Sequence, residues 1–217
     1  MAKLIIFRHA ESVYGNKTYA GNIDIPLSSN GVKQAMMLSA NVCSLHPDIV
    51  YTSNLIRAME TALLMLADVK RTITRILPDE LDSVMISREF LPLIEFNELN
   101  ERNYGELQNK SKDEVLELYS LEVIQSWRRG FYVAPPGGES FCDVVKRVQV
   151  FMDSYIFPYI KEHNILIVAH QNTMRAIYYL LMNQTPEEIE KVEFYNCEGL
   201  QFDIVNGEVE SVNVIRP

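Results

Sequence analysis

The sequence predicts an α/β protein, a single-domain three-layer sandwich in which a mostly parallel sheet is flanked by helices. Two apolar runs, residues 4–7 and 165–169, have the length and continuous hydrophobicity of strands that are buried on both faces. Segments with the 3.6-residue apolar period of amphipathic helices lie between the predicted strands. This alternation favours parallel strands joined by right-handed helical crossovers.

In the first half of the chain, residues 11–27 are rich in Gly, Asn, Ser and Pro and predict a long loop, which usually carries function. Ser28 or Ser29 then caps a predicted helix over residues 32–45. A strand over 48–52, a helix over 53–66 and a strand over 73–77 are expected next. Residues 78–100 show no clean period and give no assignment.

In the second half, Ser111 and Glu114 form a predicted capping box for one helix over residues 111–128. Prolines and glycines at 135–138 predict a turn, and Ser140 starts a helix that runs toward Tyr155. After the strand at 165–169 we expect a helix over 173–182, another from Pro186, and a hairpin of residues 200–205 and 209–214 around Asn206 and Gly207.

Composition limits the classes of partner. The 217 residues fit one domain, residues 1–217, with 47% hydrophobic and 23% charged residues. A net charge of -9 argues against nucleic acid and against an anionic membrane surface, so an anionic ligand would need a local basic pocket. Three cysteines without a C-x-x-C pair suggest neither disulfides nor a zinc site. The first apolar run is too short for a signal or membrane segment, so we expect a cytoplasmic protein.

Two histidines follow the strongest predicted strands directly. His9 follows residues 4–7 and Arg8, and His170 follows residues 165–169. Because the carboxyl ends of parallel strands face one crevice, these histidines can meet there, and Arg57 can reach the same place from the end of the second strand. Imidazole and guanidinium groups in one cleft suit attack on a phosphoryl group. Taken singly, each of them would more often be a structural histidine or a solvated arginine.

Charged residues in the middle of the chain are candidates for a proton donor and for a second anion-binding site. Glu101 and Tyr104 lie in a charged cluster that is either an exposed turn or the source of a proton donor for a leaving oxygen. Lys112, Arg128 and Arg129 could hold a second anionic group or could be solvated charges. The sequence lacks G-x-G-x-x-G, P-loop, H-E-x-x-H and EF-hand motifs, and the histidines lack metal-ligand spacing, so no metal is expected.

Beyond these features, nearly the whole chain resembles the histidine phosphatase superfamily, and within it the 2,3-bisphosphoglycerate-dependent phosphoglycerate mutases. The first and last matching segments, residues 8–12 and 169–176, are shared with many phosphatases. The matching segments in the middle of the chain are typical of mutases. The matching residues are 8–12, 52–58 with Thr61, 99–108, Lys112, 127–129, 135–136, 138–140 and 169–176.

The resemblance implies a role for each matching position. His9 would be the residue that is transiently phosphorylated, Arg8, Arg57 and His170 would hold the phosphoryl oxygens, and Glu101 would be the acid and base. Substrate would be bound by Asn16, Ala20, Gly21, Tyr104, Lys112, Arg128, Arg129, Gln171 and Asn172.

The implied activity is the interconversion of 3- and 2-phosphoglycerate in glycolysis and gluconeogenesis, with 2,3-bisphosphoglycerate as primer, in a cytoplasmic homodimer or homotetramer. Ala10 and Gln171 stand where the mutases have glycine, and the segment at 136–138 is as short as in compact bacterial forms. A shorter cover could admit water. A histidine phosphatase that hydrolyses a small phosphorylated metabolite is therefore the alternative. A noncatalytic phospho-ligand-binding protein is disfavoured because His9, Glu101 and His170 are all retained.

Overall fold

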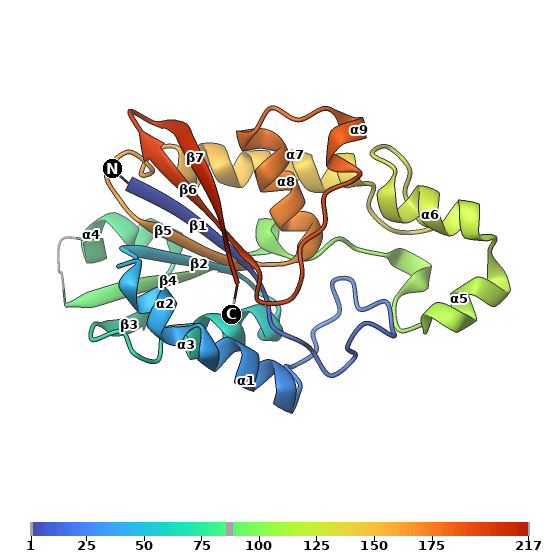
Figure 1. Cartoon of the computed structure of the whole chain (residues 1–217), viewed down its shortest axis with the longest axis horizontal. Helices are drawn as coiled ribbons and strands as arrows, with labels where there is room; N and C mark the ends of the chain where they lie inside the picture. Colours follow the sequence, from blue (N-terminus) through green and yellow to red (C-terminus); the bar gives the residue numbers. More distant parts are fainter. Residues whose placement is uncertain (1, 86–88, 217) are drawn as a thin grey trace.

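Seven strands form one mixed sheet in the residues that the computed structural model describes, 2–85 and 89–216 (Figure 1). The strand order is β3-β4-β2-β5-β1-β6-β7. The first five in this order are parallel to one another, whereas β6 and β7 are antiparallel to their neighbours. The strands are β1 (Ala2–Arg8), β2 (Ile49–Ser53), β3 (Thr72–Arg75), β4 (Phe90–Phe96), β5 (Ile165–Ala169), β6 (Gly199–Val205) and β7 (Glu208–Ile215).

Helices cover both faces of the sheet, which confirms the predicted three-layer sandwich. In Figure 1, α7 and α8 lie above the strands and α1, α2 and α3 lie below them. The helices are α1 (Ser29–Met37), α2 (Ser39–Ser44), α3 (Ile56–Met65), α4 (Leu81–Met85), α5 (Lys112–Leu118), α6 (Leu121–Arg129), α7 (Phe141–Phe151), α8 (Gln171–Leu181) and α9 (Pro186–Ile189), with short 3-10 turns at Pro78–Glu80, Asn97–Leu99 and Gly105–Leu107 and a π-turn at Met152–Ile156.

Residues 4–7 of β1 and all of β5 are continuously apolar because alternate side chains enter two different cores. Leu4 and Ile6 of β1 pack in the core under α7 and α8, whereas Ile5 and Phe7 pack in the core with α1 and α3. The side chains of β5 alternate between the same two cores, and all five of its residues are buried. This two-sided burial is the physical reason that both strands could be predicted from the sequence.

Two helices that the sequence predicts as continuous are each divided. The predicted helix at 32–45 breaks at Leu38, next to Ser39, whose hydroxyl is hydrogen-bonded to Asp68. The predicted helix at 111–128 ends at Leu118 and restarts at Leu121, because the Ser120 side chain accepts a hydrogen bond from the Val123 amide and caps a new helix. The predicted capping box at the start of α5 is confirmed.

Strand β4 lies in the segment that gave no assignment. Its sequence FLPLIEF contains Pro92, which cannot donate a ladder hydrogen bond, and Glu95, so it lacks the usual pattern of a buried strand. Pairing with β2 and β3 nevertheless makes it an inner strand. The predicted hairpin at the carboxyl terminus is confirmed, with Asn206 and Gly207 at positive φ in its turn.

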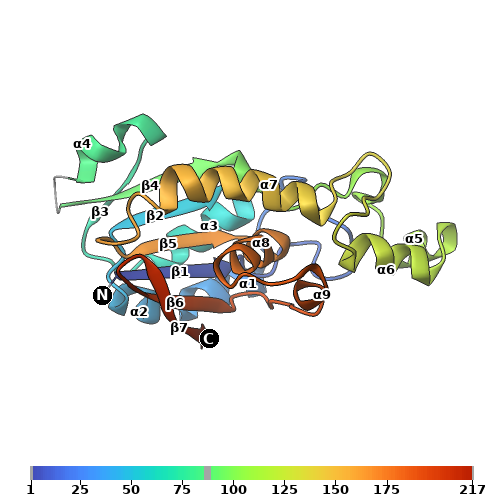
Figure 2. The ribbon, with the colours of Figure 1, turned by 90° about the horizontal axis from the view of Figure 1, so that it is seen from above.

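Helices α5 and α6 form an arm that projects away from the sheet (Figures 1 and 2). A small separate core attaches the arm to the body. In it Val115, Ile124 and Trp127 of the arm pack with Tyr19 and Leu107. The arm is therefore fixed against the loop that follows β1 rather than against the sheet.

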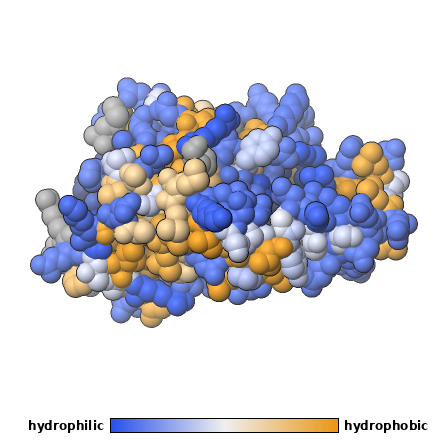
Figure 3. Space-filling model, turned by 60° about the horizontal axis from the view of Figure 1, so that its bottom comes forward, coloured by the Kyte–Doolittle hydropathy of each residue, from blue (hydrophilic) through white to orange (hydrophobic). Residues whose placement is uncertain are grey.

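Apolar side chains remain exposed on the side of the molecule that carries α1 and α3 (Figure 3). Met36, Met37 and Leu63 have 54%, 69% and 45% of their surface exposed. None of the helices in the described residues is both long and apolar enough to cross a membrane.

Gly199 provides a test of how tightly β6 packs on β1. A Cβ at this position would lie 2.4 Å from the ring of the fully buried Phe7, so we expect Gly199→Ala to lower the free energy of unfolding by about 1–3 kcal/mol. Urea unfolding measures the change. In a Phe7→Leu background the same substitution should cost less, because the clashing ring is gone; an equal cost in both backgrounds would contradict this account.

Candidate active site

The carboxyl ends of β1, β2 and β5 and the start of the arm meet in one cleft. Four lining residues are cationic, and Glu101 is the carboxylate among them. The cleft is lined by Arg8, His9, Ser12, Gly15, Asn16, Thr18, Tyr19, Ala20, Gly21, Arg57, Glu101, Tyr104, Lys112, Arg128 and Gln171. A chain with a net charge of -9 thus has a local site that is suited to an anion.

Pairing of β1 with β5 brings the two predicted histidines together. Arg8 lies opposite Ala169 in the parallel register, and the His9 amide donates to the Ala169 carbonyl at 2.9 Å. His9 and His170 each come directly after this pair, and their ring centroids are 4.9 Å apart. The two rings therefore meet, as the sequence predicts, although only His9 is among the residues that line the cleft.

Hydrogen bonds fix the tautomer of His9. Its Nδ1 lies 2.6 Å from the Ala10 carbonyl oxygen, which can only accept, so Nδ1 carries the proton. Nε2 therefore has a free lone pair and accepts from Arg57 Nε at 3.3 Å. Burial, followed by the charges of Arg57 and Arg8, keeps the pKa of His9 well below its ordinary value. The ring is therefore neutral at physiological pH, with the lone pair of Nε2 available.

Arg57 is buried at the start of α3 and is held by backbone oxygens. Its Nη1 and Nη2 donate to the carbonyls of Ile23 and Gly21, each at 2.7 Å. Burial lowers the pKa of Arg57 to about 10, so it stays protonated at neutral pH. Gly21 has a φ of +53°, and a Cβ there would lie 2.2 Å from the Gln108 side chain, which explains a glycine at this position.

His170 has a different hydrogen-bonding pattern. Its Nε2 lies 2.7 Å from the Ser53 hydroxyl, which itself accepts from the Leu55 amide and can donate its proton to the ring. In the tautomer in which Ser53 donates to Nε2, the ring proton is on Nδ1, a buried atom without a hydrogen-bond partner in the described part of the chain. Burial, followed by the charge of Arg57, also keeps the pKa of His170 well below its ordinary value. His170 is therefore equipped to donate a hydrogen bond to an incoming oxygen.

Glu101 lies where the 3-10 turn Asn97–Leu99 leads into the charged cluster. Its Oε1 accepts from the Arg102 amide at 2.8 Å and from the amide and side chain of Asn172, at 3.3 and 3.1 Å. Asn172 is in the first turn of α8, where free N–H groups favour a negative charge. An exposed turn is one of the two interpretations that the sequence leaves open for this cluster. Glu101 is instead buried, with 9% of its surface exposed.

The arm brings cations to the far part of the cleft. Lys112 at the start of α5 and Arg128 near the end of α6 both line it. Burial, followed by the charge of Arg128, lowers the pKa of Lys112, as expected for two cations that share one site. Arg129 points elsewhere: its Nη2 pairs with Glu193 Oε1 at 2.7 Å, and it is not among the lining residues.

Most of the predicted site residues are therefore brought together. Three of them do not line the cleft: Arg129 pairs with Glu193, His170 lies behind His9, and Asn172 lies behind Glu101. The sequence analysis did not single out Ser12, Thr18 and Tyr19, which line the cleft, or Ser53, which orients His170. The loop prediction at 11–27 was the signal for the first three. The Ser53 contact depends on the pairing of β2 with β5.

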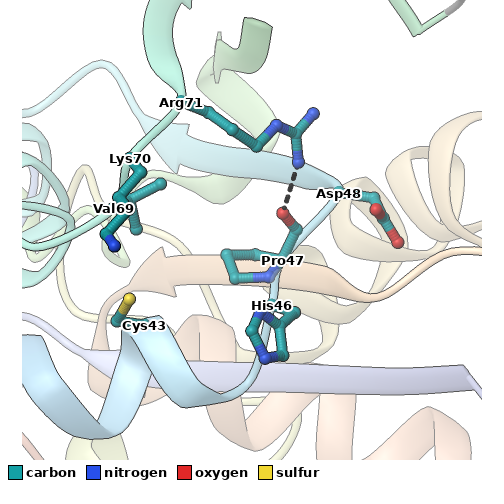
Figure 4. Close-up of a pocket in the computed structure, with 7 residues that line it drawn as sticks. All are labelled: Cys43, His46, Pro47, Asp48, Val69, Lys70 and Arg71. Atoms are coloured by element: carbon teal, nitrogen blue, oxygen red, sulfur yellow. Dashed lines mark hydrogen bonds between the residues drawn. The ribbon is translucent and has the colours of Figure 1, made fainter. Parts of the chain in front are cut away.

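Two other hollows differ from this cleft in chemistry. One is at the amino ends of the strands and is lined by Cys43, His46, Pro47, Asp48, Val69, Lys70 and Arg71 (Figure 4). Arg71 there donates to the Pro47 carbonyl and forms part of the wall. The other is a polar hollow next to Glu101, lined by asparagines with Glu139 and Arg147. In the described residues no group of three His, Cys, Asp or Glu side chains could hold a metal ion.

The two buried histidines predict a dependence of stability on pH. Their folded-state pKa values lie below the unfolded value of about 6.5, so the unfolded chain binds more protons as the pH falls below that value. The free energy of unfolding should fall between pH 7 and 5.5, by up to about 1.4 kcal/mol per pH unit for each histidine. In urea unfolding, His9→Asn and His170→Asn should each reduce this slope; unchanged slopes in both would contradict the assignment.

A comparison with protein families and curated proteins gives a consistent result. The model of the histidine phosphatase superfamily (branch 1) matches residues 4–215. The 2,3-bisphosphoglycerate-dependent phosphoglycerate mutase of Chlamydia muridarum is 37% identical over 202 residues, which are 89% of each chain. That of Chlamydia trachomatis is 35% identical over 212 residues, which are 94% of each chain.

Similar solved structures carry other names. The α-ribazole phosphatase of Shigella flexneri has a TM-score of 0.78 and 25% identity, with 99% of this chain and 96% of that chain covered. A mycobacterial glucosyl-3-phosphoglycerate phosphatase has a TM-score of 0.75 and 20% identity, with 94% and 93% covered, and this likeness concerns the fold alone. The family match over nearly the whole chain, together with the paired histidines and their arginines, establishes that the protein is a member of the histidine phosphatase superfamily.

Proposed function

We propose that the protein is a phosphoglycerate mutase that interconverts 3-phosphoglycerate and 2-phosphoglycerate through a phosphohistidine on His9. The observation that carries the proposal is that Lys112 and Arg128, on the arm, line the same cleft as His9. A plain phosphatase needs no second cationic site, whereas a mutase must hold the far anionic group of its substrate. The Chlamydia relatives that bear the mutase name, at 35–37% identity, support the same activity.

The first chemical step follows from the hydrogen bonds of the site. His9 Nε2 attacks phosphorus, the N–P bond forms, and the bond from phosphorus to the leaving oxygen breaks. Arg8 and Arg57, which line the cleft, stabilise the charge on the equatorial oxygens, and we assign His170 Nδ1, which is unpaired and next to the His9 ring, to the same task. Glu101 gives its proton to the leaving oxygen and takes it back from the hydroxyl group that accepts the phosphoryl group in the reverse transfer.

The mutase cycle needs a phosphorylated His9 before the first substrate binds. When bound, 2,3-bisphosphoglycerate supplies that first phosphoryl group. Lys112 and Arg128 would hold the part of this anion that lies farther from His9, together with Asn16 and Gln171 at the cleft wall. We place the enzyme in glycolysis and gluconeogenesis of the cytoplasm on this basis.

A phosphatase that acts on a small phosphorylated metabolite is the second candidate. The observation in its favour is the pairing of Arg129 with Glu193, which removes one of the three cations that we expected at the far anion. Phosphohistidine would then be hydrolysed rather than transferred. The two activities differ in the fate of the phosphoryl group and not in the nucleophile.

An assay with 3-phosphoglycerate, with and without 2,3-bisphosphoglycerate, separates these candidates. The mutase should form 2-phosphoglycerate without equivalent free phosphate and should depend on the primer. His9→Ala should lower this rate at least about 1000-fold, since it removes the nucleophile. Release of phosphate without the isomer would reject the mutase, and wild-type turnover by His9→Ala would reject the nucleophile.

The neighbouring arginines of α6 form a matched pair for the far anion. Arg128→Ala should raise KM for 3-phosphoglycerate about 10- to 100-fold, because a charged hydrogen bond to the substrate is lost. Arg129→Ala should change KM less than about fivefold, because its partly exposed ion pair with Glu193 contributes little. Steady-state kinetics of the two variants measure this difference. Equal effects would show that Arg129 leaves Glu193 to bind substrate.

A further inference from the structure

We infer that Arg175 is a positioning residue that, through Asn172, determines which oxygen of Glu101 carries the catalytic proton. The inference rests on the proposed role of Glu101 as proton donor and adds a residue that does not touch the substrate. Arg175 lies in α8 with 1% of its surface exposed and is not among the residues that line the cleft.

Arg175 is held in place from three directions. Its Nη2 donates to the Ile189 carbonyl at 2.8 Å, at the end of α9. Its guanidinium carbon lies 4.5 Å from the centre of the Phe141 ring, which provides a cation–π contact. Its Nη1 donates to Asn172 Oδ1 at 3.0 Å. A fixed, buried guanidinium therefore faces the side chain of Asn172.

This contact fixes the orientation of the Asn172 amide. A guanidinium has donors only, so the group that faces Arg175 must be the carbonyl oxygen of Asn172. The amino group must then face the other way, where Nδ2 donates to Glu101 Oε1 at 3.1 Å and to the Tyr104 hydroxyl at 3.2 Å. A flipped amide would place two donors against each other at Arg175 and an acceptor against the carboxyl oxygen.

The orientation distinguishes the two oxygens of Glu101. Oε1 accepts three N–H groups, from the Arg102 amide and from both nitrogens of Asn172. An oxygen that accepts three N–H groups has no lone pair left for a proton, and none of the hydrogen bonds in the described residues goes to Oε2. When Glu101 acts as the acid, Oε2 is therefore the oxygen that gives the proton. During transfer it moves from Oε2 to the leaving oxygen as the P–O bond breaks, and the new carboxylate stays anchored through Oε1.

Other cations also interact with the charge of Glu101. Their side chains, however, are hydrogen-bonded to other groups and not to either oxygen of Glu101. Arg8, Arg57 and Arg102 interact with its charge from β1, α3 and the adjacent loop position, as Arg175 does from α8. The side chain of Arg57 donates to His9 and to backbone carbonyls, and that of Arg102 donates to the carbonyls of Glu139 and Trp127. The connection from Arg175 through Asn172 provides the side-chain donor to Oε1, which acts together with the backbone amides of Arg102 and Asn172.

The test compares two phosphoryl donors that differ in their need for a proton. Loss of an alkoxide from 2,3-bisphosphoglycerate requires protonation, whereas loss of a phenolate from 4-nitrophenyl phosphate does not. Formation of phosphohistidine from each donor is measured in a single turnover. Glu101→Gln should slow the reaction of the alkyl donor about 100-fold or more and that of the aryl donor less than about 10-fold.

Arg175→Met should show the same donor-selective loss, about 10-fold, with KM nearly unchanged, because a charged hydrogen bond that positions the donor is removed. Arg175→Lys keeps a cationic donor and should restore part of the rate. Asn172→Asp keeps an acceptor for Arg175 but removes the donor to Glu101, so it tests the same connection without leaving a buried charge alone. Arg71→Met, at the opposite end of the sheet, should leave both rates unchanged.

The results distinguish the role of Arg175 from the role of Glu101. Selective loss in Glu101→Gln, Arg175→Met and Asn172→Asp supports the positioning role. If Glu101→Gln is selective but the other two slow both donors equally, the role of Arg175 is overturned while the proposed function stands. Equal slowing of both donors by Glu101→Gln would overturn the role of Glu101 as the acid, and the inference with it.

Discussion

The parallel pairing of β1 with β5 is the interaction on which the rest of the site depends. It places Arg8 opposite Ala169, so that two histidines separated by 160 positions follow neighbouring strands at the same level. A slip of one residue would exchange Leu4 and Ile6 with Ile5 and Phe7 between the two cores, and the close packing of each core around its own side chains opposes this exchange. The register that satisfies the two cores therefore also sets the 4.9 Å separation of the rings.

Burial gives this site its chemical character. Removing imidazole from water favours its neutral form, and the adjacent guanidinium groups favour it further, so the same cations that suit a phosphoryl group keep the nucleophile unprotonated. The arginines are stabilised by carbonyl oxygens, those of Gly21 and Ile23 for Arg57 and that of Phe194 for Arg8. Hydrogen bonds to neutral carbonyl oxygens thus hold these two cations in the cleft, where Glu101 is the lining carboxylate.

The buried histidines and the cations of the arm are carried by different parts of the fold. His9, Arg57 and His170 are attached to strand ends and helix starts of the rigid sheet, whereas Lys112 and Arg128 belong to an arm with its own small core. Tyr19 and Leu107, in the loops beneath the arm, join the two parts. This division is consistent with the different names of similar proteins, a phosphoglycerate mutase among the relatives and an α-ribazole phosphatase among the solved structures.

The sequence by itself determined the elements whose signals are local. Continuous apolar runs marked β1 and β5, a capping box marked the start of α5, and Asn206 with Gly207 marked the hairpin. It also identified His9, His170, Arg57 and Glu101, because residues at strand ends and the family motifs point to them. Strand β4 escaped prediction, since its stability comes from pairing with β2 and β3 and not from its own pattern.

Only the tertiary structure decided which charged groups reach the cleft and how they are oriented. Arg128 and Arg129 are adjacent in sequence, yet successive helical residues point in different directions, and one lines the cleft while the other pairs with Glu193. The contacts of Ser53 with His170 and of Arg175 with Asn172 likewise arise where separate elements pack together. Hydrogen-bond direction depends on such packing, and for that reason the sequence indicated the chemistry while the fold set the position of each proton.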